Sequence, residues 1–330
     1  MLVLFYGRSA LSFLDGFEAL CAAPPTLVAV GDDDRSPAAL RAFEGAEAVI
    51  GVHFRDPALA VPRLRLFQIA GAGLDAVDLS LLPPSATVCN CFGHEEGIGE
   101  YVLLAMLRHV VPIADADRRL RDAGDWHWSA ATAGAFHDEI AGRTLGILGY
   151  GRIGRAVARR ARAFDMEVVV ANRSPVEGDD GTVDRYLPLD DLGTLYERAD
   201  FLVCALPLTE STRSLVDAAA FARMRPTAFV INVGRGPVID EEALYRALAG
   251  RRIAGACIDT WYVYPGAGGP GPQPSRFPFR ELDNVVMTPH MSGWTFGTRR
   301  RRQRAMAENL NRLAAGEPLL NVVRAATGPP

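Results

Sequence analysis

Short apolar runs alternate with longer stretches rich in Ala, Leu and Arg along the chain. Before residue 91 these runs are LVLFY, TLVAV, EAVIGV, RLFQIA and TVCN. The pattern then restarts with TLGIL, EVVVA, DFLVCAL, AFVIN, AGACID and NVVMT. Buried strands that alternate with helical stretches are typical of parallel sheets covered by helices on both faces. The pattern therefore predicts an α/β protein with two doubly wound parallel sheets.

The longest helical stretch, residues 98–122, lies between the two series of strands and is expected to bridge two domains. Pro112 is expected to kink it, because proline lacks an amide hydrogen and its ring disrupts the preceding turn. A second helical stretch at 295–323 is amphipathic and is expected to return to the first domain. We therefore expect a discontinuous first domain of residues 1–97 and 295–330, and a second domain of residues 98–294. The Gly/Pro-rich sequence GAGGPGPQPSRFPF is expected to be irregular.

Composition narrows the class of protein. The 330 residues are 49% hydrophobic and 22% charged, which is enough to bury a substantial core. The net charge of −4 gives no overall attraction to nucleic acid or to an anionic membrane. We found no apolar run near the roughly 18 residues that span a bilayer and no signal peptide, so a cytoplasmic protein is expected. The five scattered cysteines indicate buried thiols rather than a disulfide framework or a metal site.

The sequence GYGRIG at residues 149–154 directly follows the expected strand TLGIL and opens a helical stretch. Glycines at these positions permit a tight turn and close approach of the backbone to a pyrophosphate, which the free amides of the helix N-terminus then bind. A second expected strand follows, and this context favours a ligand site over a simple glycine-rich turn. The sequence predicts a dinucleotide site that includes Gly149, Gly151, Arg152, Ile153 and Gly154.

The end of the second strand indicates which dinucleotide binds. A carboxylate there would hydrogen-bond an unphosphorylated ribose, but this chain has Asn172, Arg173 and Ser174. A guanidinium pairs well with a 2′-phosphate, and the neutral side chains can add hydrogen bonds. NADP(H) is therefore favoured and NAD(H) remains possible. The alternative is that Arg173 stacks on the adenine or faces water.

Further motifs follow in one order, namely GAGLDAVDL, RDAGDW, LPLT, INVGRG, the pair Asp240-Glu241, the strand end at Asp259, and TPH at 288–290. This set resembles the D-isomer-specific 2-hydroxyacid dehydrogenase family over nearly the whole chain. The resemblance implies a flavodoxin-like substrate domain, a Rossmann dinucleotide domain, NAD(P)H bound in the cleft, and a homodimer formed through the cofactor domain. It also implies cofactor contacts from Leu206, Pro207, Thr212, Val233, Asp259, His290 and Gly293.

The chemistry of a small 2-oxo acid explains several of these residues. Arg235 is the one cation in the apolar sequence VINVGRGPVI, and its planar fork suits a carboxylate. His290 can donate a proton to the carbonyl oxygen, or accept one in the reverse reaction. The resemblance implies a second carboxylate anchor from the backbone amides of Gly71, Ala72 and Gly73. Trp294 is expected either to line the substrate cleft or to be simply buried.

One position departs from the family pattern. The family usually has a Glu before a Pro, five residues after the strand-end Asp, which hydrogen-bonds the catalytic histidine. Here Tyr264 stands in that place, before Pro265. A phenol can orient an imidazole but cannot stabilise its cation by opposite charge, so the usual upward effect on the histidine pKa is expected to be lost. The alternative is a different carboxylate, from the Gly/Pro-rich loop or from Glu281.

We therefore expect NAD(P)H-dependent reduction of a small 2-oxo acid, glyoxylate or hydroxypyruvate by resemblance, to the D-2-hydroxy acid. A formate dehydrogenase-like reaction is one alternative, since that branch also lacks the Glu and shares the Ser-Gly found here at residues 292–293. A corepressor-like scaffold that senses the dinucleotide is another. The arginine run at 299–304 could then contact nucleic acid, although a helix would spread these side chains toward acids and water.

Overall fold

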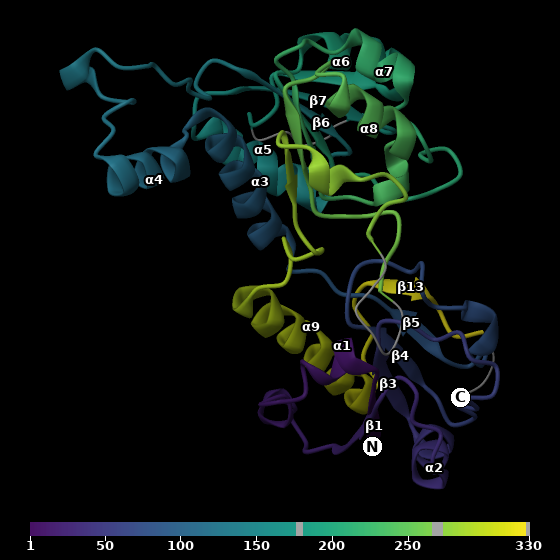
Figure 1. The fold of residues 1–330 in the computed structure, drawn as a ribbon. Coiled ribbons are helices and arrows are strands. Elements are labelled where there is room, and N and C mark those ends of the chain that lie inside the picture. The colour runs from purple at the N-terminus through teal and green to yellow at the C-terminus, as the bar shows by residue number, and fades with distance from the viewer. Residues whose placement is uncertain (176–180, 266–272, 328–330) are drawn as a thin grey trace. The chain divides into compact units, whose positions relative to one another are not determined.

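The computed structural model describes residues 1–175, 181–265 and 273–327 (Figure 1). The chain divides into two compact units. Unit 1 comprises Met1–Gly93 and Thr295–Pro330, and unit 2 comprises His94–Trp294. Each unit is built on its own sheet of mainly parallel strands, which confirms the expected α/β class with two doubly wound sheets.

Unit 1 contains a six-stranded sheet in the order β13-β5-β4-β3-β1-β2. Its strands are β1 (Leu2–Tyr6), β2 (Thr26–Val30), β3 (Ala48–Gly51), β4 (Leu66–Ile69), β5 (Thr87–Cys89) and β13 (Val322–Arg324). The first five pair in parallel, and β13 runs antiparallel to β5. The helices of this unit are α1 (Arg8–Leu11), α2 (Pro37–Gly45) and α9 (Phe296–Ala315).

Both faces of this sheet are apolar because both are covered. Val3 and Phe5 on one face share a core cluster with Leu310 of α9. Leu4 on the other face belongs to the cluster that contains Phe43 of α2. The helix expected over 295–323 is shorter than predicted, because Gly316 adopts a left-handed conformation that ends α9 and the chain then forms β13.

Unit 2 contains a seven-stranded parallel sheet in the order β12-β11-β10-β9-β6-β7-β8. Its strands are β6 (Thr144–Leu148), β7 (Glu167–Asn172), β8 (Arg185–Pro188), β9 (Phe201–Cys204), β10 (Phe229–Asn232), β11 (Gly255–Ile258) and β12 (Val285–Met287). The chain builds outward from β6 to β8 and then starts again at β9 beside β6. Ligands of such sheets bind at the carboxyl ends of the strands where the order reverses, here between β6 and β9.

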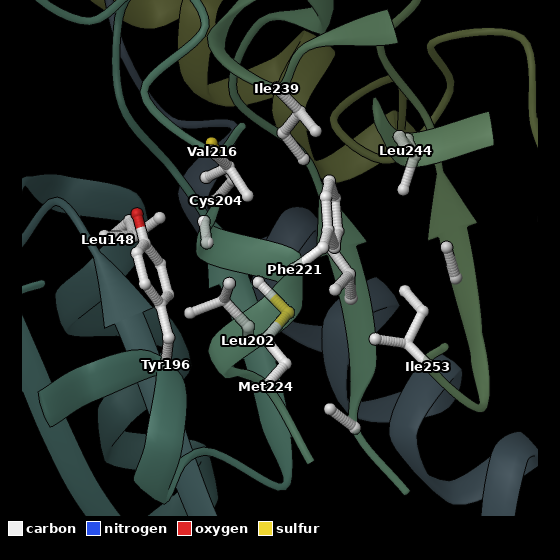
Figure 2. Close-up of a cluster of buried hydrophobic side chains, with 14 of the residues drawn as sticks. Leu148, Tyr196, Leu202, Cys204, Val216, Phe221, Met224, Ile239, Leu244 and Ile253 are labelled. Carbon is white, nitrogen blue, oxygen red and sulfur yellow. The ribbon is translucent and has the colours of Figure 1, made fainter. Parts of the chain in front are cut away.

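Helices pack on both faces of the second sheet. They are α3 (Glu95–Val110), α5 (Arg152–Arg162), α6 (Leu192–Arg198), α7 (Ala218–Arg223) and α8 (Glu241–Ala249), whereas α4 (Ile113–Ala123) has no buried residue. Figure 2 shows one face, where Tyr196 and Phe221 lie against Leu202. The opposite face carries Ile147 and packs with Val102 of α3 and Val157 of α5.

The expected long helix is two helices. Proline ends the first at Val110, and α4 begins after Pro112 at an angle of 52° to α3. The whole of α3 belongs to unit 2, so the expected boundary between residues 97 and 98 falls inside a helix. Within the described ranges no single helix is long and apolar enough to cross a membrane, and only the bent pair α3 and α4 reaches that length and composition together.

Two further expectations concern loops and thiols. Residues 266–272 of the Gly/Pro-rich stretch lie outside the described residues, and its last residue, Phe279, begins a 3₁₀ turn. All five cysteines are free, and four of them are buried. Burial raises the pKa of the Cys89 thiol to about 11 and that of Cys204 to about 12, which keeps both protonated at neutral pH.

Candidate active site

The expected site residues of unit 2 follow the carboxyl ends of its strands. Because the strands are parallel, these ends all leave the sheet at one edge. The residues in question are Gly149 after β6, Asn172 at the end of β7, Leu206 after β9, Arg235 after β10, Asp259 after β11 and His290 after β12.

The glycine-rich turn after β6 has the geometry of a phosphate site. Gly149 has a φ of +94°, and a Cβ there would lie 2.9 Å from the Leu206 side chain. A Cβ on Gly154 would lie 2.3 Å from the Gly149 carbonyl oxygen, so the helix packs too closely for any side chain. At Gly151 the described structure has no such neighbour within 4 Å. Open space beside the N-terminus of α5 fits a pyrophosphate held by backbone amides.

Two residues between these glycines form the first turn of α5. Arg152 is exposed and Ile153 is half-buried. Gly151 is the N-cap residue and supplies no side-chain hydrogen bond, so the first amides of the helix are not capped by a side chain of that residue. These amides are the groups that an anion would bind.

The turn after β7 is fixed by Asn172. Its side-chain oxygen accepts a hydrogen bond from the Tyr150 amide at 3.3 Å, and its nitrogen donates to the Ser174 carbonyl at 3.0 Å. The side chains of Arg173 and Ser174 are exposed. The Arg173 guanidinium is therefore accessible to a phosphate or to water.

The loop after β9 is stabilised by Thr212. The Thr212 hydroxyl donates to the Pro207 carbonyl at 2.7 Å and accepts from the Thr209 amide at 2.8 Å. Leu206 is buried, and Pro207 is exposed. These hydrogen bonds of Thr212 lie within the loop, and its expected contact with the cofactor stays a prediction.

Arg235 is held by the two glycines beside it. A Cβ on Gly234 would lie 2.6 Å from the Leu206 carbonyl oxygen, and one on Gly236 would lie 2.3 Å from that of Trp261. The loop after β10 therefore passes close to the backbones of both neighbouring loops. Arg235 is half-buried and donates to the Gly234 carbonyl at 2.9 Å. The preceding residue, Val233, is part of the core.

His290 is exposed and has a left-handed backbone, with a φ of +57°. The Tyr264 hydroxyl lies 3.0 Å from its Nδ1 and also accepts a hydrogen bond from the Trp261 amide at 3.2 Å. Burial raises the pKa of the Tyr264 phenol, while the nearby Arg235 opposes this increase. Tyr264 thus lies near Arg235 and within hydrogen-bond distance of His290, and one partner of this histidine is a neutral hydroxyl.

Asp259 holds the turn that carries His290. It is fully buried, and its carboxylate accepts hydrogen bonds from the Thr288 hydroxyl at 2.5 Å, the Met291 amide at 2.8 Å and the Ser292 amide at 3.0 Å. Asp259 therefore stabilises the turn at residues 288–292. Its contact with the nicotinamide carboxamide stays a prediction. Among the residues that the structure describes, no hydrogen bond or ion pair joins Glu281 to His290.

Tyr101 extends this network and is not among the site residues expected from the sequence. Its hydroxyl lies 2.6 Å from Thr288 Oγ1 and 3.0 Å from Cys257 Sγ. Because the single hydroxyl hydrogen of Thr288 goes to Asp259, Tyr101 donates to Thr288 and the Cys257 thiol donates to Tyr101. Burial raises the pKa of both Tyr101 and Cys257, which keeps these donors protonated. Its spacing of three residues from Ile98 could have placed Tyr101 on the apolar face of this helix, but could not have revealed its contacts with Thr288 and Cys257.

The Gly71–Gly73 loop follows β4 in unit 1. The Gly71 carbonyl accepts from the Cys91 amide and the Ala72 carbonyl from the Asn90 side chain, both at 2.9 Å. No hydrogen bond to another described residue uses the amides of Gly71, Ala72 or Gly73. These amides are therefore available to a ligand of unit 1.

Gly293 and Trp294, which follow the TPH motif, are the last of the expected site residues. Trp294 is 56% exposed, which excludes simple burial within unit 2. Its amide donates to the Met291 carbonyl at 2.8 Å. Gly293 is half-buried, and a Cβ there would lie 3.1 Å from the His94 side chain.

Comparison with known proteins gives the family. The sequence model of the D-isomer specific 2-hydroxyacid dehydrogenase, NAD binding domain, matches residues 102–292. The glyoxylate reductase of Korarchaeum cryptofilum is 34% identical over 269 residues, which cover 80% of this chain and 77% of that protein. Glyoxylate/hydroxypyruvate reductase B of Pectobacterium carotovorum is 33% identical over 292 residues, covering 86% and 87%.

Solved structures agree over almost the entire chain. The 2-hydroxyacid dehydrogenase from Ketogulonicigenium vulgare has a TM-score of 0.80 at 29% identity and covers 98% of both chains. The NADPH-dependent glyoxylate/hydroxypyruvate reductase from Sinorhizobium meliloti, in complex with NADP and malonate, has a TM-score of 0.76 at 25% identity and covers 99% of both. The chain therefore belongs to the D-isomer-specific 2-hydroxyacid dehydrogenase family and is an oxidoreductase that acts on CH–OH groups with a nicotinamide dinucleotide.

Proposed function

We propose that this enzyme reduces a small 2-oxo acid to the D-2-hydroxy acid and catalyses the reverse oxidation. The observation that carries the proposal is the cluster of Arg235 and His290 at the sheet edge that also holds the glycine-rich turn. Relatives named glyoxylate reductase and hydroxypyruvate reductase support the substrate class. Unit 2 then serves as the dinucleotide domain and unit 1 as the substrate domain.

In the proposed reaction Arg235, the Gly71–Gly73 loop and His290 have separate roles. Arg235 binds the substrate carboxylate through its planar fork, and the amides of the Gly71–Gly73 loop add hydrogen bonds. The dinucleotide, bound at the turn 149–154, supplies hydride to the carbonyl carbon. His290 donates a proton to the carbonyl oxygen as that oxygen gains negative charge. Because Tyr264 engages Nδ1, this proton transfer is assigned to Nε2.

We infer a preference for NADP(H). The turn after β7 offers the exposed Arg173 guanidinium and no carboxylate at Asn172 or Ser174. A 2′-phosphate would gain an ion pair there, whereas an unphosphorylated ribose would lack the usual acidic partner. NAD(H) remains a usable alternative in this assignment.

We also propose a homodimer formed through unit 2. Figure 1 shows α4 and the loop after it extending from the rest of that unit. Large apolar side chains are exposed along this segment, including Ile113 at 70% and Phe136 at 99%. Apolar groups in this arrangement are usually covered by a partner. The cytoplasmic location expected from the sequence stays a prediction.

Two alternative functions are each suggested by one feature of the sequence. The absence of an acid at Tyr264 favours a formate dehydrogenase-like reaction, which needs no proton transfer to a carbonyl. A corepressor-like role would use the arginine run of α9, but Arg299 pairs with Asp15 at 3.1 Å and Arg301 donates to the Gly93 carbonyl at 2.7 Å. These contacts favour a structural role for both arginines.

A substrate panel tests the proposal. Glyoxylate, hydroxypyruvate and pyruvate are reduced with NADPH or NADH, and formate and phosphite are offered for oxidation. We expect reduction of at least one 2-oxo acid and no oxidation of formate. Formate or phosphite turnover without 2-oxo acid reduction would replace the proposal, and no turnover of any substrate would favour the scaffold.

Kinetics of two variants test the assigned roles. Arg235→Ala should raise KM and lower kcat, because a misplaced carbonyl loses alignment. His290→Ala should chiefly lower kcat, by about 10²- to 10⁴-fold. Arg246→Ala on the exposed face of α8 and His137→Ala in an exposed loop serve as matched controls. Undiminished reduction by His290→Ala would show that the proton donor lies elsewhere.

A further inference from the structure

A histidine–aspartate pair lies at the carboxyl edge of the sheet in unit 1. His53 follows β3 and Asp32 follows β2, and His53 Nε2 lies 3.3 Å from Asp32 Oδ1. The other Asp32 oxygen accepts a hydrogen bond from the Arg8 amide at 3.1 Å. A Cβ on Gly7, whose φ is +85°, would lie 2.7 Å from both the carboxylate and the imidazole. The pair therefore fills the space that a glycine leaves after β1.

The imidazole is fixed but accessible. The Tyr6 ring lies with its centroid 4.8 Å from that of His53, so the imidazole is held by Tyr6, Asp32 and Gly7. The side chains of His53 and Asp32 remain 31% and 28% exposed. Nδ1 of His53 has no hydrogen-bond partner among the described residues. A carboxylate that orients one ring nitrogen and leaves the other open is typical of histidines that contact ligands.

The position of the pair in the fold also indicates a ligand. In the sheet order β4-β3-β1-β2 all strands are parallel, but β2 is added on one side of β1 and β3 on the other, and sheets of this kind bind ligands outside the carboxyl ends at the point where the strand order reverses. Gly7 and His53 are the residues that leave the sheet there. The pair is thus at the expected ligand edge of unit 1, independently of unit 2.

Backbone hydrogen bonds connect His53 to the loop that supplies the second carboxylate anchor. Strand β3 pairs with β4 in the register Gly51 to Ile69, and the Ala70 amide donates to the Gly51 carbonyl at 2.9 Å. The Phe54 amide donates to the Ala76 carbonyl at 2.9 Å. The segment of His53 is therefore bonded to both ends of the Gly71–Gly73 loop. A small acid held by that loop would therefore lie beside the segment of His53.

We propose that His53 contacts the group on the substrate carbon next to the carbonyl and selects 2-oxo acids that bear a hydroxyl there. This inference rests on the proposed function. With Nε2–H directed to Asp32, the neutral ring presents a lone pair at Nδ1, whereas the protonated ring presents an N–H. A hydroxyl matches both states, because it can donate to the first and accept from the second.

Other substrate side chains match less well. A methyl group would desolvate Nδ1 without replacing its hydrogen bond to water, which costs affinity. A carboxylate would match only the protonated ring. Glyoxylate has no carbon at this position and would not reach His53. The inference therefore separates hydroxypyruvate from pyruvate and leaves glyoxylate unaffected.

The experiment measures kcat/KM for hydroxypyruvate, pyruvate and glyoxylate in the full-length parent, His53→Phe and His53→Gln. We expect His53→Phe to lower the value for hydroxypyruvate about ten- to a hundredfold while glyoxylate changes less than about threefold. His53→Gln, whose amide can both donate and accept, should retain part of the selectivity. Asp32→Asn should give an intermediate loss, because it weakens the orientation of the ring. His137→Phe is the matched control, and thermal unfolding identifies variants that fold poorly.

Each other outcome overturns the assignment. Equal losses on hydroxypyruvate and glyoxylate would make His53 a structural residue, and unchanged values on both would show that it does not contact the substrate. If kcat/KM falls only for a 2-oxo dicarboxylic acid and is unchanged for hydroxypyruvate, His53 recognises a substrate carboxylate and not a hydroxyl. If the parent reduces no 2-oxo acid, the proposed function fails and this inference fails with it. If His53→Phe does not fold, the glutamine variant gives the same comparison.

Discussion

Tyr264 changes the electrostatics of proton transfer without removing the contact to the histidine. Its hydroxyl lies 3.0 Å from His290 Nδ1, so it can orient the imidazole as a carboxylate would. Burial raises the pKa of the phenol, which keeps it neutral at physiological pH. A neutral partner does not favour the imidazolium over the imidazole by charge. In the proposed reaction, Tyr264 therefore holds the proton donor His290 in place and provides it with no negative charge.

Tyr264→Glu tests that consequence. If reduction requires the imidazolium, activity falls as pH rises through the pKa of His290. A carboxylate within hydrogen-bond reach favours the charged ring, so the alkaline limb of the kcat/KM profile should move upward by roughly one to three pH units. Tyr264→Phe is the control, since it removes the hydroxyl without adding charge and should not move the limb upward. The parent enzyme could instead have an alkaline limb that already lies well above neutrality and that Tyr264→Glu does not move. This result would indicate that another carboxylate pairs with His290.

Arg173 determines cofactor preference in the proposed site. Arg173→Ala should weaken catalysis with NADPH far more than with NADH, by about 1 to 3 kcal/mol in transition-state free energy, because a charged hydrogen bond is lost. The comparison measures kcat/KM with NADPH and with NADH over the same series of 2-oxo acid concentrations. Arg185→Ala, at the start of the edge strand β8, is a control with the same charge change. Equal losses with both cofactors, or an NADH preference in the parent, would contradict the assignment.

At the level of elements, the strand ends could be predicted and the packing between elements could not. The runs before Gly149, Arg235 and His290 are apolar and end at polar motifs, so sequence periodicity was enough to locate the site edge. Strand β8 was missed because RYLP carries only one buried residue. The break at Pro112 was expected as a kink, but the angle between α3 and α4 depends on what each helix packs against.

Two residues show why the remaining parts of the site could not be predicted. Tyr101 reaches Thr288 and Cys257, which lie 187 and 156 residues away in the sequence, and no pattern along one helix reveals such contacts. Asp32 lies in the polar sequence GDDDR, where nothing distinguishes it from its two acidic neighbours. Its role appears only when β1, β2 and β3 bring it to Gly7 and His53.

The hydrogen-bonded chain from Tyr101 to Asp259 links α3 to the turn that carries His290. Tyr101→Phe should leave Thr288 Oγ1 and the Cys257 thiol without their partner and lower the free energy of unfolding by about 1 to 3 kcal/mol. It should also lower kcat, because Asp259 positions the Met291 and Ser292 amides beside His290. Urea unfolding and steady-state kinetics measure the two effects.

Tyr196→Phe provides the matched control for that substitution. Tyr196 is buried and its hydroxyl donates to the Leu215 carbonyl at 3.3 Å, away from the residues 288–292. It should lose stability without a comparable loss of kcat. If both variants reduce kcat equally at similar stability, the chain ending on Asp259 has a structural role only.

At the scale of the whole molecule, the proposed dimer rests on the extended segment of unit 2, which consists of α4 and the loop after it. Its helix α4 has no buried residue, and ion pairs such as Asp115 with Arg119 stabilise it locally. Trp126 and Phe136 in the loop that follows are exposed although burial of either would be strongly favourable. A second copy of the chain would bury both segments at once, because a two-fold interface uses the same surface on each subunit.

Analytical ultracentrifugation of the parent and of a double variant, Trp126→Asp with Phe136→Asp, tests this expectation. The parent should sediment at twice the chain mass at micromolar concentration, and the double variant should sediment as a single chain, since two buried charges per subunit would oppose association. Phe164→Asp is the control, because Phe164 is also an exposed aromatic residue of unit 2 but lies outside this segment. A parent that remains a single chain, or a double variant that still dimerises, would contradict an interface built from α4 and its following loop.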